Sequence, residues 1–189
     1  MYEGVDTVVL HDELAYEDVL PVSWRPLAEP LDSIGLASLT DRNVKLLQVC
    51  AAIEEHGSIE KQDKESPHSA DLLRIEVKMN LLLELVGQIL VASQPRPKPV
   101  SVRFNALGVV WKSTGSAPEM GRQGILEIYL RDCLASPLSL IARVSSVTPD
   151  GQVKARLVPP GEQIADLIEK LAFRRHRRQV AGVRQPRRA

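Results

Sequence analysis

The sequence predicts an α+β protein: a small antiparallel β-barrel with two inserted helices, the longer of them a coiled-coil oligomerisation helix, and a further helix at the C-terminus. Three observations lead to this fold class. Residues 71–91 carry a heptad pattern of apolar side chains, residues 100–158 contain five short runs suited to strands, and residues 162–181 are amphipathic. A chain of 189 residues is long enough for one globular unit with an appendage.

The apolar residues of segment 71–91 follow one another at spacings of three and four, an average that places one seam along a helix. The positions beside this seam also become apolar in the second half of the segment. Two-stranded coils have charged flanks, so the pattern favours more strands, and we expect a trimer or a tetramer. The predicted oligomerisation seam consists of Leu72, Ile75, Met79, Leu82, Val86 and Ile89.

Two other interpretations of this segment stay open. An ordinary buried helix also fits, because the regular seam covers only about three heptads, near the minimum for a coiled coil. A membrane span fits poorly, because Arg74, Glu76, Lys78 and Glu84 interrupt the apolar run and charges at the centre of a bilayer are costly. We therefore expect no membrane span.

Before the heptads, the chain predicts extended segments and then a first helix. Residues 5–10 and 19–24 are short β-branched runs, and the prolines around the second run place it at a sheet edge or outside the sheet. Ser38 or Thr40 caps a helix that runs to about His56. This helix has a seam of its own that we expect to pack on the longer helix: Leu39, Asn43, Leu46, Cys50 and Ile53.

After three prolines at 95, 97 and 99, which end the helical section, the sequence pattern changes to short predicted strands separated by turn residues. Alternating apolar residues and short turns favour a closed barrel or a meander. The predicted strands are 100–104, 108–112, 124–131, 138–147 and 152–158. The closing helix has an apolar stripe formed by Ile164, Leu167, Ile168, Leu171 and Ala172.

These elements divide the chain into four parts. We expect extended segments and the first barrel strand, then the helical pair, then the barrel with its C-terminal helix, and last a basic disordered tail. The boundaries are 1–37, 38–93, 94–182 and 183–189.

Charge is distributed unevenly although the net charge is zero. Residues 1–32 carry eight acids and one base, whereas residues 174–189 carry seven arginines and no acid, so the two ends attract each other or partners of opposite charge. A tail of arginines without interleaved aromatic residues is only a general polyanion signal, so we do not expect nucleic acid as the partner.

The sequence offers no catalytic or metal site. Its four histidines are scattered, and the adjacent Glu54 and Glu55 do not share a helix face, so we expect both to be solvated. Cys50 and Cys133 have no metal-ligand spacing and fit buried, unpaired thiols. The acidic N-terminus has no signal-peptide pattern. We expect a cytoplasmic protein that is not an enzyme and has no cofactor.

The order of elements resembles that of the PilZ domain family, and most of all its atypical, tetramer-forming branch. The resemblance rests on the heptad seam, on the segment VSVRFNALGVVW and on the strand pair LSLIARVSSVTPDGQVKARLV. In that branch two helices are inserted into the barrel domain, and the longer one assembles a parallel four-stranded coiled coil. The resemblance implies a homotetramer.

Typical members bind cyclic di-GMP through RxxxR ahead of the barrel and [D/N]xSxxG at a turn between strands. Here the second motif keeps Gly108, but Arg103 stands in place of the acid or amide and Asn105 in place of the serine. Upstream of the barrel no RxxxR is present. Arg174 and Arg178 have the right spacing, at the opposite end of the domain. A lone base cannot replace a bidentate arginine fork on a phosphate, so the resemblance implies weak or absent binding.

Two functions follow as hypotheses. The first is a non-enzymatic adaptor with a degenerate ligand site, which acts through contacts with an unidentified protein partner in bacterial signalling or surface motility. The second is a functional cyclic di-GMP receptor with a non-standard site built from Arg103, Asn105, Gly108, Arg174 and Arg178.

Overall fold

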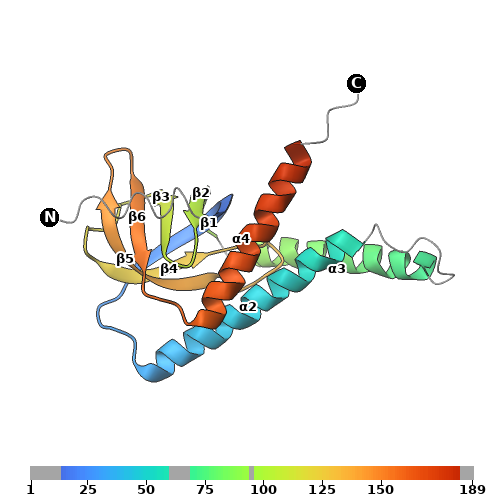
Figure 1. Cartoon of the computed structure of the whole chain (residues 1–189), viewed down its shortest axis with the longest axis horizontal. Helices are drawn as coiled ribbons and strands as arrows, with labels where there is room; N and C mark the ends of the chain where they lie inside the picture. The colour runs from blue at the N-terminus through green and yellow to red at the C-terminus, as the bar shows by residue number, and fades with distance from the viewer. Residues whose placement is uncertain (1–13, 60–68, 94–95, 184–189) are drawn as a thin grey trace.

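The structure is a computed structural model that describes residues 14–59, 69–93 and 96–183 (Figure 1). It confirms the predicted fold class, a closed barrel of antiparallel strands with three helices. The strands are β1 (Tyr16–Pro26), β2 (Pro99–Phe104), β3 (Gly108–Lys112), β4 (Gln123–Ile128), β5 (Leu138–Val147) and β6 (Gln152–Leu157). The helices are α2 (Ser33–Ile59), α3 (Ser69–Ser93) and α4 (Glu162–Val183). The extended run predicted at 5–10 and the tail from 184 on lie outside the described residues.

The barrel strands follow one another around the barrel in the order β1-β2-β3-β6-β5-β4. The strand β1 closes this ring, because residues 16–21 pair with β2 and residues 22–26 pair with β4. The expectation that its prolines would keep the run at a sheet edge or outside the sheet was therefore only half right. Each half of β1 has one hydrogen-bonded neighbour, and Pro21 lies where the neighbour changes, so its missing amide donor costs little there.

Aliphatic and aromatic side chains fill the barrel. Phe104, Leu126, Ile128 and Leu138 are all fully buried, as the alternating pattern of their strands predicts. The ring of Trp24 lies against Gly124, where a Cβ atom would come within 2.5 Å of that ring. Only glycine therefore allows the tryptophan to pack here.

The predicted caps Ser38 and Thr40 both lie inside helix α2, whose cap is six residues before Ser38. Asp32 is its cap: Oδ1 accepts a hydrogen bond from the Gly35 amide at 2.8 Å, and the backbone carbonyl accepts one from the Leu36 amide at 3.0 Å. The seam residues Leu39 and Leu46 are buried. The prediction that this seam packs on the longer helix, α3, was wrong. Within the described part of the chain, α2 packs chiefly against α4 and β5.

Asn43 explains why this helix turns to the barrel. Its side-chain Nδ2 donates to the Ser139 carbonyl at 2.7 Å, and its Oδ1 accepts from the Ser139 amide at 3.0 Å. Asn43 itself is buried, so the two hydrogen bonds fix the position of α2 along β5 in a site that excludes water.

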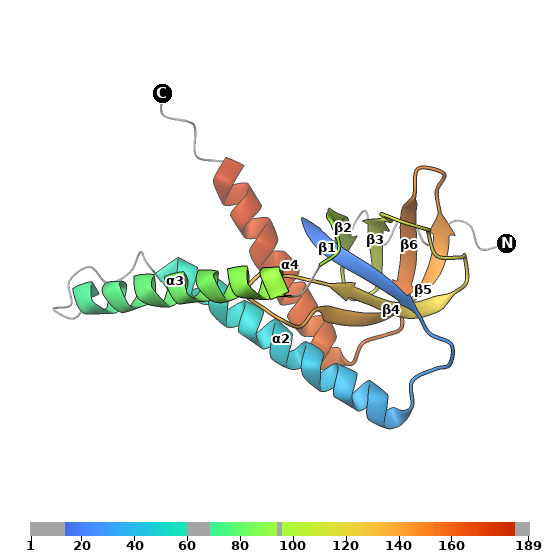
Figure 2. The same ribbon diagram turned by 180° about the vertical axis from the view of Figure 1, so that it is seen from behind.

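Helix α3 projects away from the barrel, as both ribbon views show (Figures 1 and 2). Its C-terminal part contacts the loop after β4 at Gly87, where a Cβ atom would lie 3.3 Å from the Cys133 backbone nitrogen.

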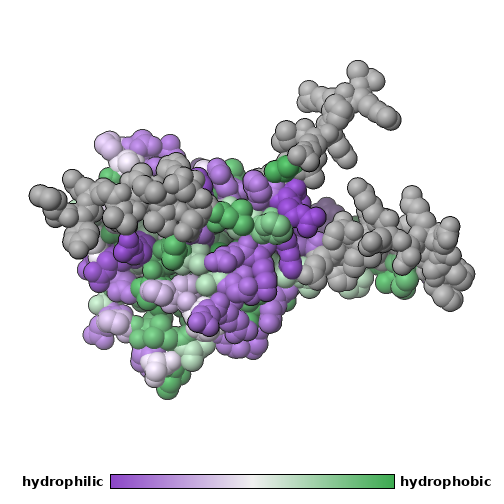
Figure 3. Space-filling view, viewed as in Figure 1, coloured by the Kyte–Doolittle hydropathy of each residue, from purple (hydrophilic) through white to green (hydrophobic). Residues whose placement is uncertain are grey.

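Helix α4 buries the predicted apolar stripe, with Ile164, Ile168 and Leu171 nearly inaccessible. Hydrophilic residues cover its outward side (Figure 3). None of the helices in the described ranges is long and apolar enough to cross a membrane.

We predict that Asn43→Ala lowers the free energy of unfolding by about 2–4 kcal/mol, because it leaves two backbone groups of Ser139 without their partner in a dry site. Urea titration at one fixed protein concentration measures the loss. The exposed neighbour Arg42→Ala is the matched control and should cost less than about 0.5 kcal/mol. Equal losses in the two variants would contradict the role of Asn43.

We also predict a loss of stability at alkaline pH. Burial, with the nearby Asp18 carboxylate, raises the pKa of Tyr16 from 10.0 to about 12. The folded state therefore holds its phenol proton more tightly than the unfolded state, and this stability is present below pH 10 and is lost between about pH 10 and 12. Burial likewise raises the pKa of Cys50 to about 11.

Urea midpoints between pH 8 and pH 11.5 test this expectation. Tyr16→Phe removes the phenol and should make the alkaline decline shallower by up to about 2 kcal/mol at pH 11.5, while it loses only a 3.3 Å hydrogen bond to Asp18 at neutral pH. A decline as steep as that of the wild type would contradict the assignment to Tyr16.

Candidate functional site

The turn between β2 and β3 holds two of the predicted ligand-binding residues, Asn105 and Gly108. The buried Asn105 side chain accepts hydrogen bonds from the Leu107 amide at 2.9 Å and the Gly108 amide at 3.0 Å. The Asn105 amide in turn donates to the Gly108 carbonyl at 3.1 Å. The side-chain oxygen of Asn105 therefore builds the turn itself.

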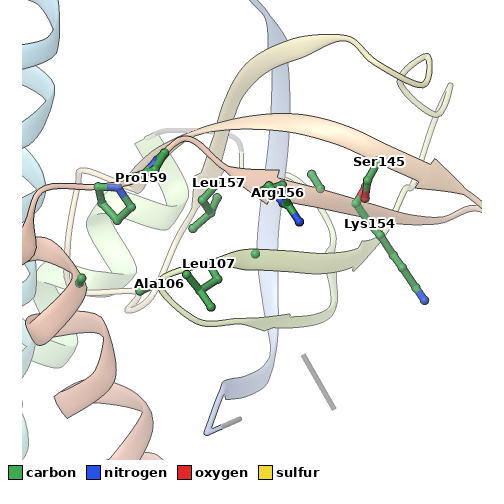
Figure 4. A pocket seen from close by; sticks show the side chains of 11 residues that line it. Ala106, Leu107, Ser145, Lys154, Arg156, Leu157 and Pro159 are labelled. Carbon is green, nitrogen blue, oxygen red and sulfur yellow. The ribbon is translucent and has the colours of Figure 1, made fainter. Parts of the chain in front are cut away.

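A cavity of about 360 Å³ lies beside this turn (Figure 4). Its walls come from the turn, from β5 and β6, from the prolines after β6 and from the first turn of α4. The lining is mainly small and apolar, with Leu107 and Leu157 as its large aliphatic residues. Lys154 and Arg156 supply the charge, and no lining residue is acidic. This composition suits an apolar ligand with an anionic group.

Arg103 is the next-to-last residue of β2, opposite Glu17 of β1, and is half-buried; it does not line the cavity. Two arginines upstream of the turn, Arg25 and Arg74, do not reach it. Arg25 is at the far end of β1, 3.8 Å from the Glu127 carboxylate. Arg74 is on the exposed surface of α3. The arginine pair that the typical ligand motif requires is not assembled beside the turn among the described residues.

Arg174 and Arg178 also lie away from the turn. The cavity touches α4 at Ala165, and Arg178 is thirteen residues further along the helix, about 20 Å by the helical rise. Arg178 donates through Nη2 to the Glu54 carbonyl at 3.1 Å, and its Nη1 lies 3.4 Å from the Glu54 carboxylate. This arginine therefore contributes to the packing of α4 on α2.

Glu54 is not solvated, contrary to the prediction. Its side chain is 1% exposed, and the Arg131 guanidinium lies 2.6 Å from Oε1. The second oxygen, Oε2, is buried without a hydrogen-bond partner. The inner face of α2 continues from Leu47 through Cys50 to Glu54 at helical spacing, and this continuity was the sequence signal for burial.

The opposite charges of the two chain ends do meet at one place. The Arg175 guanidinium of α4 lies 2.7 Å from the Asp18 carboxylate of β1. It also lies 5.9 Å from the centre of the Tyr16 ring. Through this ion pair and cation–π contact, the helix is fixed to the strand that closes the barrel.

Arg96 is a structural residue that the sequence analysis missed. It follows α3, and its buried guanidinium donates to the carbonyls of Arg131, Asp132 and Leu134 and to the Asp132 carboxylate. It also stacks on Tyr129, 5.1 Å from the ring centre. Arg96 therefore fixes the loop after β4 against the base of α3.

The predicted oligomerisation seam lies on the exposed surface of α3. Its six side chains are between 46% (Val86) and 66% (Ile89) exposed in the single chain. Further apolar residues around the helix, Val77, Leu81 and Leu85, are also exposed. A second cavity, of about 690 Å³, lies between α3, the Ile53 region of α2 and the loop after β4.

Metal binding has no assembled site in the described residues. No cluster of three or more histidine, cysteine, aspartate or glutamate side chains there has the geometry to hold a metal ion. The buried charged groups are engaged in ion pairs that join elements of the fold.

Comparison with known proteins gives a consistent result. Among curated proteins, none matches the chain. A solved structure from Xanthomonas campestris, described as a new tetrameric PilZ domain self-assembled via an unusual helical bundle, is similar to it with a TM-score of 0.69. The two share 27% sequence identity over 93% of this chain and 95% of that one.

The family model for the atypical PilZ domain, cyclic di-GMP receptor, matches residues 47–185. This range holds α3, five of the six barrel strands and α4. The chain belongs to the atypical PilZ domain family.

Proposed function

We propose that the protein is a non-enzymatic, cytoplasmic signalling adaptor that assembles into a homotetramer through a coiled coil of α3. In this proposal it acts through contacts with a protein partner, in bacterial signalling or surface motility, and its cyclic di-GMP site is degenerate. Both cysteines are free thiols, as expected for a protein of a reducing compartment.

The observation that carries the proposal is the exposure of the α3 seam. Six apolar side chains in heptad register are about half exposed on a helix that projects from the barrel. A monomer rarely exposes a contiguous apolar surface of this kind without a partner. Because the flanks of the seam, such as Leu85, are also apolar and exposed, a bundle of several strands buries more of the helix than a dimer. The related tetramer from Xanthomonas campestris supports the same assembly.

A second candidate is a cyclic di-GMP receptor with a non-standard site. The observation that favours it is the cavity beside the β2–β3 turn, where Lys154 and Arg156 lie next to Gly108. Guanidinium and ammonium groups bind phosphates, but Arg103 and the α4 arginines do not join this cavity. The arrangement therefore favours the adaptor over the receptor.

We predict that Leu82→Asp converts the tetramer to monomers, because each strand would bring an unpaired carboxylate into the apolar centre of the bundle at a cost of several kcal/mol. Light scattering coupled to gel filtration gives the mass. Val77→Asp is the matched control: it adds the same charge to an equally exposed valine away from the seam and should stay tetrameric. A Leu82→Asp protein that keeps the tetramer mass would refute the assembly through the seam.

We predict no measurable heat when cyclic di-GMP is titrated into tens of micromolar folded protein, because no bidentate arginine pair meets the β2–β3 turn. Micromolar binding that is lost in Lys154→Ala/Arg156→Ala but kept in Lys112→Ala would establish the receptor instead. Lys112 is an exposed base outside the cavity and so controls for general charge.

A further inference from the structure

We propose that the exposed side of α4 is an interface between two copies of the chain, in which the two helices pack antiparallel. The contact surface, here called the outer stripe, consists of six exposed residues at helical spacing: Asp166, Glu169, Phe173, His176, Arg177 and Val180. The inference goes beyond the proposed adaptor function, because it assigns a second surface for self-association and needs no contact through α3. It rests on where the outer stripe lies, on the order of its charges and on the place of Phe173.

The outer stripe faces away from the body of the protein. Phe173 and Val180 are seven residues apart and therefore lie on one side of the helix. Arg175 and Arg178, whose ion pairs hold α4 on β1 and α2, lie on the opposite side, about 180° away at about 3.6 residues per turn. The last turns of α4 also extend beyond the barrel (Figures 1 and 2). A partner can therefore reach the outer stripe without disturbing the contacts that hold the helix.

The charge of the outer stripe changes sign at its middle. Glu169 is four residues before Phe173, and Arg177 is four residues after it. When two such helices run antiparallel about a two-fold axis at Phe173, Glu169 of each copy lies opposite Arg177 of the other. In a parallel pair, by contrast, each charge would face its own copy. The outer stripe is therefore complementary to itself in the antiparallel orientation.

The same axis places Asp166 opposite Val180 of the other copy, since both are seven residues from Phe173. This pairing would be unfavourable for a free carboxylate. Asp166, however, already has the Lys170 ammonium at 2.7 Å, one turn along its own helix. The aliphatic side chain therefore meets an acid whose charge is balanced.

Phe173 supplies the apolar centre of the contact. Its side chain is 52% exposed, although α4 buries its other large apolar residues near this point, such as Leu171. The Arg177 guanidinium lies 5.9 Å from the centre of the Phe173 ring. Aromatic residues and arginine are the types enriched at the centre of protein interfaces. On the two-fold axis the two rings meet, and each Arg177 reaches its own ring and the Glu169 carboxylate of the other copy.

Other classes of partner match only half of the outer stripe. An anionic membrane, a nucleic acid or an acidic peptide would be attracted by Arg177 and repelled by Glu169, two turns away. A second copy presents the opposite charge to each half. One helix pair is a small interface, so copies that are already joined elsewhere bind through it more tightly than single chains do.

Disulfide trapping on the full chain tests the proposal. Asp166→Cys/Val180→Cys places two thiols opposite each other in the antiparallel pair, at an effective concentration on the order of millimolar. Under copper–phenanthroline oxidation of tens of micromolar protein, covalent dimers should form about tenfold more than in the wild type, whose thiols are Cys50 and Cys133. Each single variant should stay at the wild-type level, because the two copies of one position lie about 21 Å apart along the axis.

Charge exchange in the Asp166→Cys/Val180→Cys protein provides the matched control. Arg177→Glu sets carboxylates opposite Glu169 and should lower the dimer yield at least about fivefold. Adding Glu169→Arg should restore the yield. Glu119→Arg, which changes an exposed acid in the loop between β3 and β4, should not restore it, although the net charge is the same.

Two results would overturn the proposal. The first is a double-cysteine yield no higher than that of the single variants, which would leave the outer stripe to a different partner. The second is a yield that Arg177→Glu does not change, because random collisions would then form the disulfide.

Discussion

Closure of the barrel by β1 is the constraint on which the other elements depend. This strand pairs with β2 through one half and with β4 through the other, so both ends of the sheet meet on one eleven-residue segment. The pairing of β1 with β2 also fixes the two ends of the insertion that contains α2 and α3. The insertion begins after Pro26 and ends at Pro99, which lies opposite Pro21. A long insertion at such a hairpin costs little closure entropy, since that cost grows only with the logarithm of its length.

A chain of polar contacts then fixes the direction in which α3 leaves the barrel. Glu54 of α2 is bonded to Arg131 in the loop after β4, and Arg96 binds the backbone of the same loop. The helix itself approaches that loop where Gly87 meets Cys133. Buried charges are costly unless paired, so the loop has little freedom to move while these ion pairs persist. A rigid base of this kind presents the apolar seam in one direction, as assembly of several copies requires.

Periodic features of the fold could be predicted from the sequence, and features that depend on partners distant in the sequence could not. Alternation and turn residues gave the strands after residue 99, and the stripe led by Ile164 gave the buried face of α4. The packing of α2 was misjudged, because a helical seam specifies a buried face without specifying its neighbour. The burial of Glu54 and Arg96 was not predicted for a related reason. A charged residue is expected to be solvated until its partners are known, and these lie 77 residues from Glu54 and 35 to 38 residues from Arg96.

The β2–β3 turn is held together by its own side chain, whatever it binds. Asn105 accepts hydrogen bonds from two turn amides, and this role requires no ligand. Of the two α4 arginines with the spacing of the missing motif, Arg178 binds Glu54, and the neighbouring Arg175 binds Asp18. Each ion pair strengthens the contact of α4 with α2 or β1. These two ion pairs therefore fix α4 to α2 and to the strand that closes the barrel.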